Sequence, residues 1–352
     1  MTDTKRKTTH DTTSTMSSNK GMTRRTFIWS AAAGGVIAGA AVPFRKVYAG
    51  KKHRLRYVTF VNKNSVWGQP YHFMAEEVDK ASGGELKIQY AGGSEVVGGF
   101  DAPEAVAKGV FDMSHSANSY FAGAMPSSIS LASGNASLQK LRDSGVLALY
   151  DSILQERRGL KLLGVPMSGV GYVFMTRGEP KDLSYFKGKK IRSIPLYDPI
   201  LQELGAVTVT TSPAEAYTAL ERGVVDGLGW PDIGLFDFKF HKQAKFVMAP
   251  SFYTLRTCTL MNPNSFNKLP KELQDVLVKA SKSADDRGEA WCAERSAKER
   301  AKMTSEGLTV TELPSAQGGK FVSMTEDKLW TKVLDQSPDN GAKLKAAFSK
   351  VG

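Results

Sequence analysis

The chain has 352 residues, 41% of them hydrophobic and 23% charged, and its formal net charge is +12. This is the composition of an ordinary soluble globular protein that is long enough for two domains. No run of basic residues is interleaved with aromatic ones, which argues against a nucleic-acid-binding protein. Residues 50–352 hold 39 basic and 33 acidic side chains, a mild excess that suits attraction of anionic solutes and equally suits an ordinary basic surface.

The N-terminal stretch has the organisation of an export signal. A polar segment precedes the pair Arg24 and Arg25, and a short apolar segment, residues 27–42, follows it. This segment is too short and too rich in Ala and Gly for a good membrane span. Because Ala49 offers a cleavage site, we predict that residues 1–49 are a twin-arginine (Tat) signal peptide with a polar extension, and that the mature protein is periplasmic. An uncleaved N-terminal anchor is the alternative.

From residue 54 onward, strand-like and helix-like segments alternate. This alternation predicts an α/β fold with a mostly parallel sheet and helices on its faces. Asn62, Asn118 and Tyr120 follow predicted strands and could face a cleft at the edge of the sheet. For the two asparagines, a role in forming a turn is the alternative. In this part of the chain we expect strands at residues 55–61, 85–90 and 111–114, and helices at residues 67–82 and 103–108.

Two further strands are expected at residues 161–165 and 171–176. The second carries Tyr172, which could donate a hydrogen bond to a ligand or lie in the core with its hydroxyl satisfied.

The stretch of residues 187–231 reads as strand, helix, strand, helix. Ser212 and Glu215 predict a capping box at the start of its second helix. Arg192 lies at the carboxyl end of the first strand, where ligands bind in open α/β sheets. Its planar guanidinium matches the two oxygens of a carboxylate. An exposed strand-end arginine is the alternative.

The remainder of the chain predicts two strands and several helical segments. Cys258 and Cys292 have no CxxC spacing and no companion histidines, which argues against a zinc or redox site. A disulfide between them is compatible with an oxidising compartment, but we expect two separate buried thiols. The expected elements are strands at residues 245–247 and 252–261, a helix at residues 269–305 that could kink at Gly288, then a strand and a last helix at residues 340–350.

The same central stretch resembles a family signature. It contains Gly188-Lys189-Lys190-Ile191-Arg192, then Leu204-Gly205-Ala206, then the segment from Ser212 to Gly227. Over roughly forty residues, the order and spacing are similar to those of the extracytoplasmic solute receptors of TRAP (tripartite ATP-independent periplasmic) transporters of the DctP type. The resemblance implies a two-lobed periplasmic solute-binding protein fold (type II-like), with a hinge and a long helix that spans both lobes. It also implies that Arg192 holds the carboxylate of an organic acid.

The resemblance also implies a division into two domains. We expect domain I to comprise residues 50–169 and 258–295, and domain II to comprise residues 170–257 and 296–352. The predicted strand at residues 252–261 would then cross between the domains, so that Arg256 and Tyr253 could point into the cleft. If Arg256 is a second clamp, a four-carbon dicarboxylate becomes a candidate ligand.

The chain differs from its relatives at three positions around the expected pocket. Many relatives have a Pro-Phe wall where this chain has the small, polar segment of residues 131–136, which predicts a roomier or more polar pocket. Some relatives place a second arginine where this chain has Tyr172 or its neighbours. Others use a glutamate on a metal ion where this chain has Gly229, so we expect no metal. The next residue, Trp230, offers an indole N–H and a flat apolar wall, with a buried core tryptophan as the alternative.

These features predict the periplasmic solute receptor of a TRAP transporter. We expect it to be a monomer that binds a small organic anion without any cofactor. The ligand would be a monocarboxylate with hydroxy, oxo or aromatic character, handed to the small and large membrane subunits of the permease. A receptor that feeds a sensor kinase is one alternative. A periplasmic enzyme is another, although the chain has no HExxH, GxSxG, P-loop or Rossmann fingerprint.

Overall fold

The computed structural model describes residues 52–351, so the expected export signal lies outside the described residues. None of the helices between residues 52 and 351 combines the length and the apolar character that a membrane span requires. The strands are β1 (His53–Thr59), β2 (Leu86–Gly92), β3 (Met113–Ala117), β4 (Lys161–Gly164), β5 (Ser168–Thr176), β6 (Lys190–Ser193), β7 (Val207–Thr210), β8 (Gly227–Pro231), β9 (Phe246–Met261) and β10 (Thr309–Glu312).

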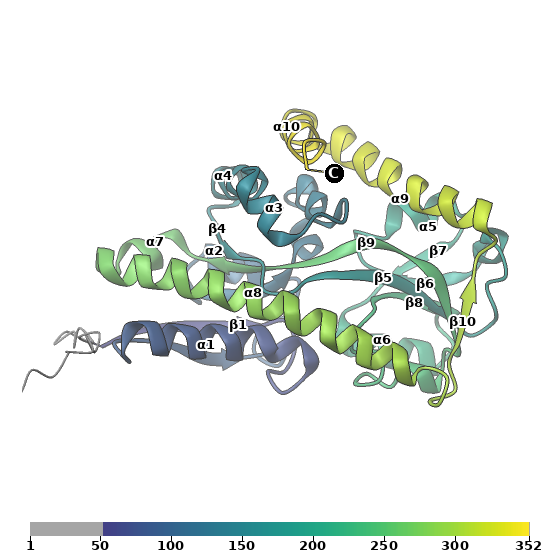
Figure 1. Ribbon diagram of the computed structural model, residues 1–352, viewed down its shortest axis with the longest axis horizontal. Helices are drawn as coiled ribbons and strands as arrows, with labels where there is room; N and C mark the ends of the chain where they lie inside the picture. Colours follow the sequence, from purple (N-terminus) through teal and green to yellow (C-terminus); the bar gives the residue numbers. More distant parts are fainter. Residues whose placement is uncertain (1–51, 352) are drawn as a thin grey trace, which may run out of the picture. The chain divides into compact units, whose positions relative to one another are not determined.

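Helices pack around these strands (Figure 1). The α-helices are α1 (Gln69–Ser82), α2 (Ala102–Ala107), α3 (Leu138–Asp143), α4 (Val146–Arg158), α5 (Asp198–Glu203), α6 (Pro213–Glu221), α7 (Pro263–Asn267), α8 (Lys271–Lys302), α9 (Ser315–Gln336) and α10 (Pro338–Phe348). Short 3-10 helices are η1 (Val66–Gly68), η2 (Asn118–Phe121), η3 (Pro126–Ala132), η4 (Leu183–Phe186) and η5 (Phe240–Lys242).

Strand β9 joins two groups of strands into one sheet with the order β2-β1-β3-β9-β5-β8-β6-β7. In the first group, β1 pairs in parallel with β2 and β3, and β3 pairs with the second half of β9, residues 257–261. In the second group, β6 pairs in parallel with β7 and β8, and β5 pairs with β9 between residues 246 and 256. The two groups are the two lobes of the fold, and β9 passes from one to the other.

Helix α8 connects the two lobes on the outside of the sheet. In Figure 1 it runs beside α1 at one end and reaches the region of α6 and β10 at the other. Gly288 lies in the middle of this continuous helix, where a Cβ would approach the carbonyl oxygen of Pro166 to 1.8 Å. Glycine is therefore required here for close packing of the helix on the chain before β5. Buried apolar side chains form one cluster between α1, α8 and the first lobe's sheet, and a larger cluster through the rest of the molecule.

Several expected elements are confirmed, two expected strands form a single one, and several helices were not expected. The alternating strands and helices, the capping box of Ser212 and Glu215, and the long helix are all present. Cys258 and Cys292 are buried, unpaired thiols, as expected. The two strands expected after residue 244 form the single strand β9, because its residues 248–256 pair with β5 without a break in the strand. Helices α3, α4, α7 and α9 were not predicted.

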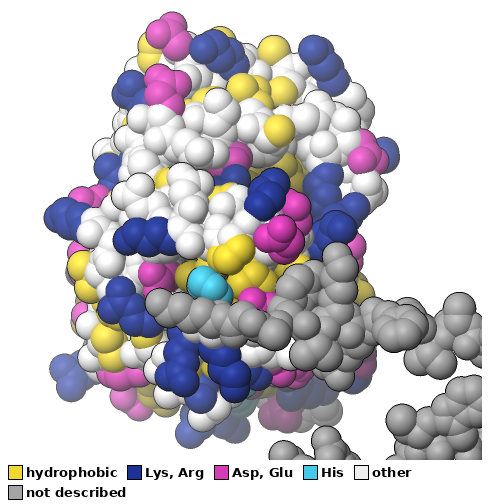
Figure 2. Space-filling model, turned by 90° about the vertical axis from the view of Figure 1, so that its left-hand side faces the viewer, with side chains coloured by type: hydrophobic (Ala, Val, Ile, Leu, Met, Phe, Trp, Pro, Cys, Tyr) yellow, Lys and Arg dark blue, Asp and Glu magenta, His cyan; other side chains and the backbone are white. Residues whose placement is uncertain are grey.

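Charged side chains are mixed in sign on the face drawn in Figure 2. On this face, at the end of the molecule where α7 and the start of α8 lie, Lys and Arg are spread among Asp and Glu. A surface of mixed sign generates little directed field, so the basic net charge does not form a single patch on this side.

Candidate functional site

A cavity lies where the carboxyl ends of parallel strands from both lobes meet. Phe60 and Tyr120 follow β1 and β3, whereas Ile194, Tyr197 and Pro213 follow β6 and β7. Ligands of open α/β sheets bind at such ends because the loops there leave a crevice. The lining comprises Phe60, Trp67, Ala117, Tyr120, Tyr172, Arg192, Ile194, Tyr197, Pro213, Trp230, Pro231, Leu255 and Thr257.

Aromatic side chains from both lobes close this cavity. The indole rings of Trp67 and Trp230 meet edge to face, with centroids 5.9 Å apart. Tyr172 and Tyr197 meet in the same way at 5.3 Å. The remaining volume is about 30 Å³, which is room for one or two water molecules. A molecule larger than this enters only when the side chains that line the cavity move apart.

Arg192 is the charged side chain in the lining, and it is 1% exposed. Its Nη1 donates to the carbonyl of Gly229 at 3.3 Å, and its Nη2 donates to the carbonyl of Thr211 at 2.8 Å. The guanidinium carbon lies 5.2 Å from the centroid of the Trp230 ring. The buried Nε has no hydrogen-bond partner among residues 52–351. A guanidinium has five N–H donors, so several of them remain for a ligand.

No carboxylate among residues 52–351 forms an ion pair with this buried charge. Among the ion pairs of the described residues, none includes Arg192. Burial lowers the pKa of its guanidinium, while the neighbouring Tyr120 and Tyr197 hydroxyls act in the opposite direction. Burial also raises the pKa of Tyr120 to about 12, so its hydroxyl is neutral and can donate. Because burying a charge without a counter-ion is costly, this site is suited to an anion supplied from outside.

The structure brings four of the sequence-predicted site residues together. Arg192, Trp230, Tyr172 and Tyr120 all line the cavity. Trp230 is also a packed residue: it is 3% exposed, and its Nε1 donates to the carbonyl of Ile233 at 3.2 Å. It therefore presents the face of its ring to Arg192, while its indole N–H is already bonded.

The two asparagines lie outside the lining. Asn62 is exposed, and its Oδ1 accepts a hydrogen bond from the backbone N–H of Asn64 at 2.9 Å. This is the turn-forming role that was the alternative to a ligand contact. Asn118 is buried in η2 beside the cavity. Its Nδ2 has no partner among the residues that the structure describes.

Arg256 is equally buried but faces the other side of β9. Leu255 and Thr257 line the cavity, and successive side chains of a strand point to opposite faces. The Nη1 of Arg256 donates to the carbonyls of Leu131 and Ser133 at 2.7 and 2.8 Å, and its Nη2 donates to that of Ala136 at 2.7 Å. Residues 131–136, which were expected to make the pocket roomier or more polar, therefore hold Arg256 with their backbone and do not line the cavity.

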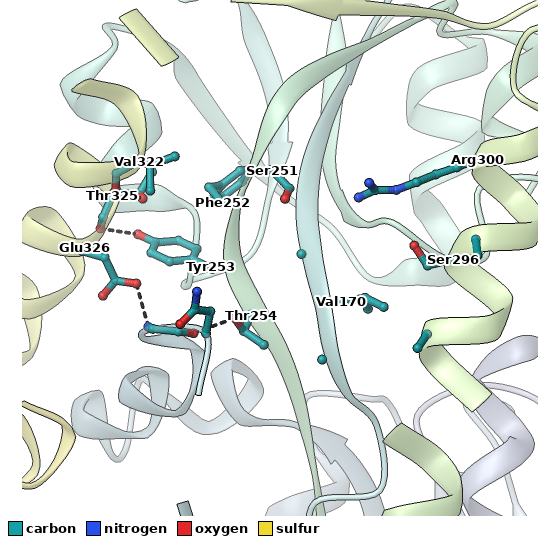
Figure 3. A pocket seen from close by; sticks show the side chains of 16 residues that line it. Val170, Ser251, Phe252, Tyr253, Thr254, Ser296, Arg300, Val322, Thr325 and Glu326 are labelled. Atoms are coloured by element: carbon teal, nitrogen blue, oxygen red, sulfur yellow. Dashed lines mark hydrogen bonds between the residues drawn. The ribbon is translucent and has the colours of Figure 1, made fainter. Parts of the chain in front are cut away.

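A larger groove of about 690 Å³ lies on that second face, beside β5 and β9 (Figure 3). Figure 3 shows Arg300 and Ser296 of α8 on one side of the strands and Val322, Thr325 and Glu326 of α9 on the other. The charged groups here already have partners. Glu326 accepts from the backbone N–H of Gly134 at 2.8 Å, and Arg300 forms an ion pair with Asp232. The groove thus offers space without an unsatisfied charge.

Several lining residues were not predicted. Tyr197 and Pro213 lie within a few residues of the carboxyl ends of strands β6 and β7, so the rule that pointed to Arg192 could also have found them. Trp67 and Thr257 carry no such signal, because one lies in a short 3-10 helix and the other within a long strand.

Metal ligands are not gathered in this site. Within residues 52–351, no three His, Cys, Asp or Glu side chains form a set that could hold a metal ion. The space beside Gly229 is filled by an aromatic ring: a Cβ there would lie 2.7 Å from Cδ2 of Tyr197. A side chain at this position would displace that ring.

The fold and this cavity define a two-lobed solute-binding protein of the α/β class. The family model described as "Bacterial extracellular solute-binding protein, family 7" (DctP) matches residues 57–336. The chain therefore belongs to this family of bacterial extracellular solute-binding proteins.

Individual relatives are distant. The chain is 28% identical over 227 residues to a "Monocarboxylate 2-oxoacid-binding periplasmic protein" of Nostoc, a match that covers 60% of each chain. Among solved structures, a TRAP periplasmic solute binding protein from Desulfovibrio salexigens with bound orotic acid has a TM-score of 0.77 at 19% identity, covering 86% of this chain and 100% of the other. Another, from Colwellia psychrerythraea with bound calcium and pyruvate, has a TM-score of 0.76 at 20% identity, covering 86% and 94%. These structures share the fold.

Proposed function

We propose that the protein is the solute receptor of a TRAP transporter and that it binds the carboxylate of a small organic acid through Arg192. The observation that carries the proposal is a fully buried guanidinium with free N–H donors and no counter-ion among the described residues. A carboxylate would supply the missing charge and accept two parallel hydrogen bonds. Tyr120 would add a donor beside it. Orotic acid and pyruvate, named with the related structures, are both carboxylic acids, which supports this ligand class.

The ligand is a monocarboxylate with a compact hydroxy, oxo or aromatic body. Arg192 is the one cationic side chain in the lining, and Arg256 faces the opposite side of β9. A second carboxylate would therefore enter a wall of aromatic and aliphatic groups without a partner, at a considerable cost in desolvation. A planar or short carbon body, in contrast, would pack between the rings of Trp67, Tyr172 and Trp230.

Binding closes two domains around the acid, and the closed form is delivered to the membrane subunits of the permease. We place domain I at residues 50–169 and 258–295 and domain II at residues 170–257 and 296–352, with β9 and α8 as the connections at the hinge. The receptor acts as a periplasmic monomer without a cofactor. Residues 1–49 direct its export by the twin-arginine pathway, which the pair Arg24 and Arg25 would specify.

A thermal-shift screen of the mature protein, starting at Gly50, against a panel of organic acids tests the proposal. A ligand present at one hundred times its dissociation constant stabilises a protein by about 2.7 kcal/mol, which is readily measured. We expect monocarboxylates to raise the melting temperature of the wild type and to leave that of Arg192→Ala unchanged. Stabilisation of both proteins by the same acid would show that the carboxylate binds elsewhere.

A further inference from the structure

Thr257 lines the cavity at the point where β9 begins to pair with β3. It is the first residue of β9 that pairs with β3, opposite Ala117, whereas Arg192 lies on β6. Strands β5 and β8 separate β9 from β6 in the sheet. If Arg192 binds the carboxylate of a ligand, the other polar atoms of that ligand therefore lie toward the side of the cavity that includes Thr257.

The hydrogen bonds of His115 fix the direction of the Thr257 hydroxyl. His115 is fully buried, and its Nδ1 lies 3.1 Å from the carbonyl oxygen of Trp67. A carbonyl oxygen only accepts, so Nδ1 carries the proton of the neutral ring. The Nε2 atom, 2.8 Å from Oγ1 of Thr257, must then accept. It follows that the Thr257 hydroxyl donates its proton to His115.

Protonation of the imidazole would reverse this direction, because both ring nitrogens would then donate. Burial opposes it strongly and lowers the pKa of His115 to about 3. Among the described residues, three groups contact the ring: the Phe60 ring, with its centroid 5.0 Å away, the carbonyl oxygen of Trp67, and the Thr257 hydroxyl. None of these is a carboxylate. The ring is therefore neutral at any pH at which the receptor works.

Because the Thr257 hydroxyl donates its hydrogen bond to His115, its oxygen can only accept a hydrogen bond from a ligand in the cavity. We propose that Thr257, oriented by His115, makes this side of the cavity a hydrogen-bond acceptor and selects carboxylic acids that carry an O–H or N–H donor over their oxo and unsubstituted analogues. The inference rests on the proposed function, since it assumes a carboxylate on Arg192. It narrows the ligand class from hydroxy, oxo or aromatic acids to acids with a donor, such as 2-hydroxy acids or acids with a ring N–H. Thr257 is the specificity-determining residue and His115 a positioning residue.

Matched acids that differ in one group test the polarity of this side of the cavity. The probes are two series: lactate, pyruvate and propionate, and mandelate, phenylglyoxylate and phenylacetate, measured by calorimetry. We expect the wild type to bind the hydroxy acid of whichever series fits at least about tenfold more tightly than the oxo acid, because two facing acceptors leave both unsatisfied. In Thr257→Val, which keeps the shape but lacks the acceptor, the ratio should fall to about twofold. The control Thr257→Ser keeps the hydroxyl and should keep the preference.

The role of His115 has a separate readout. His115→Leu removes the group that accepts the Thr257 hydrogen bond, so the hydroxyl becomes free to donate to a ligand. The affinity for the oxo acid, relative to that for the hydroxy acid, should then rise by about tenfold. A loss of packing alone would weaken both acids equally and would overturn the positioning role. Equal binding of hydroxy and oxo acids by the wild type, or an unchanged ratio in Thr257→Val, would overturn the inference. If Arg192→Ala still loses both acids in that case, the proposed function stands; if it loses neither, the proposed function fails instead.

Discussion

Two arginines are buried to the same degree on opposite sides of the strands that join the lobes, and they differ in what surrounds them. The Nη groups of Arg256 donate to backbone carbonyls of residues 131–136, so these N–H groups serve the fold. Arg192 donates to only two carbonyls, beside a cavity, although the Nε of both arginines lacks a partner among residues 52–351. Burial alone therefore does not distinguish a structural cation from a binding cation. The distinction lies in how many of its donors the protein itself satisfies.

The largest expected effect is on ligand affinity in Arg192→Met. Deleting one partner of a desolvated charge pair typically costs about 2–5 kcal/mol, or roughly thirty-fold to several-thousand-fold in affinity. The melting temperature of the ligand-free protein should stay the same or rise, because an uncompensated buried charge is replaced by an apolar side chain of similar length. Calorimetry and thermal melting measure the two effects. Binding within about threefold of the wild type would place the anchor elsewhere.

The same substitution at the other arginine should have the reverse consequence. Arg256→Met leaves several buried carbonyls without donors, at about 1–3 kcal/mol for an unsatisfied group, so we expect unfolding to become easier by about 2–4 kcal/mol. Affinity for the acid should change by less than about threefold. Denaturant unfolding of the two Met variants, side by side, tests this directly. If Arg256→Met loses affinity but not stability, the two arginines have been assigned the wrong way round.

A smaller effect is expected from pH. Burial lowers the pKa of His115 to about 3 and raises that of Tyr120 to about 12. His115 is thus neutral above its depressed pKa, and Tyr120 is neutral below its raised one, so neither changes charge near neutrality. Affinity for a carboxylate should be constant within about twofold from about pH 5.5 to 8.5. A transition with a midpoint near the ordinary pKa of histidine would show that the ring is accessible to solvent.

The smallest expected effect is that of chelation. Within residues 52–351 no cluster of ligating side chains is present, and Tyr197 occupies the space beside Gly229. Affinity measured before and after exhaustive treatment with a chelator should agree within about threefold. A tenfold loss, about 1.4 kcal/mol, would reveal a metal that helps Arg192 hold the acid.

The sequence was sufficient to place Arg192 at the carboxyl end of a strand, because this position depends on local features. A short strand, its carboxyl end and a capped helix are all encoded within a few residues of Arg192. The alternation of strands and helices, which follows from hydrophobic periodicity, likewise predicted most elements and the long helix α8.

The role of Arg256 depends on which face of β9 it occupies, and local sequence does not determine this. Tyr253 has a φ of 49°, and the pairing of β5 with β9 shifts register at three places. Simple alternation therefore cannot be counted along the strand from a known position. Thr257 and His115 are 142 residues apart, and only the pairing of β3 with β9 brings them together. Contacts of this kind come from the tertiary structure.

The sharing of β9 and α8 between the lobes also determines how the molecule comes apart. Strand β9 pairs with β3 and β4 through one half and with β5 and β10 through the other, so neither lobe keeps a complete sheet if its neighbour unfolds. Helix α8 likewise contributes buried side chains along its whole length, from Leu273 to Glu299. The lobes should therefore melt in one cooperative transition, with equal calorimetric and van't Hoff enthalpies.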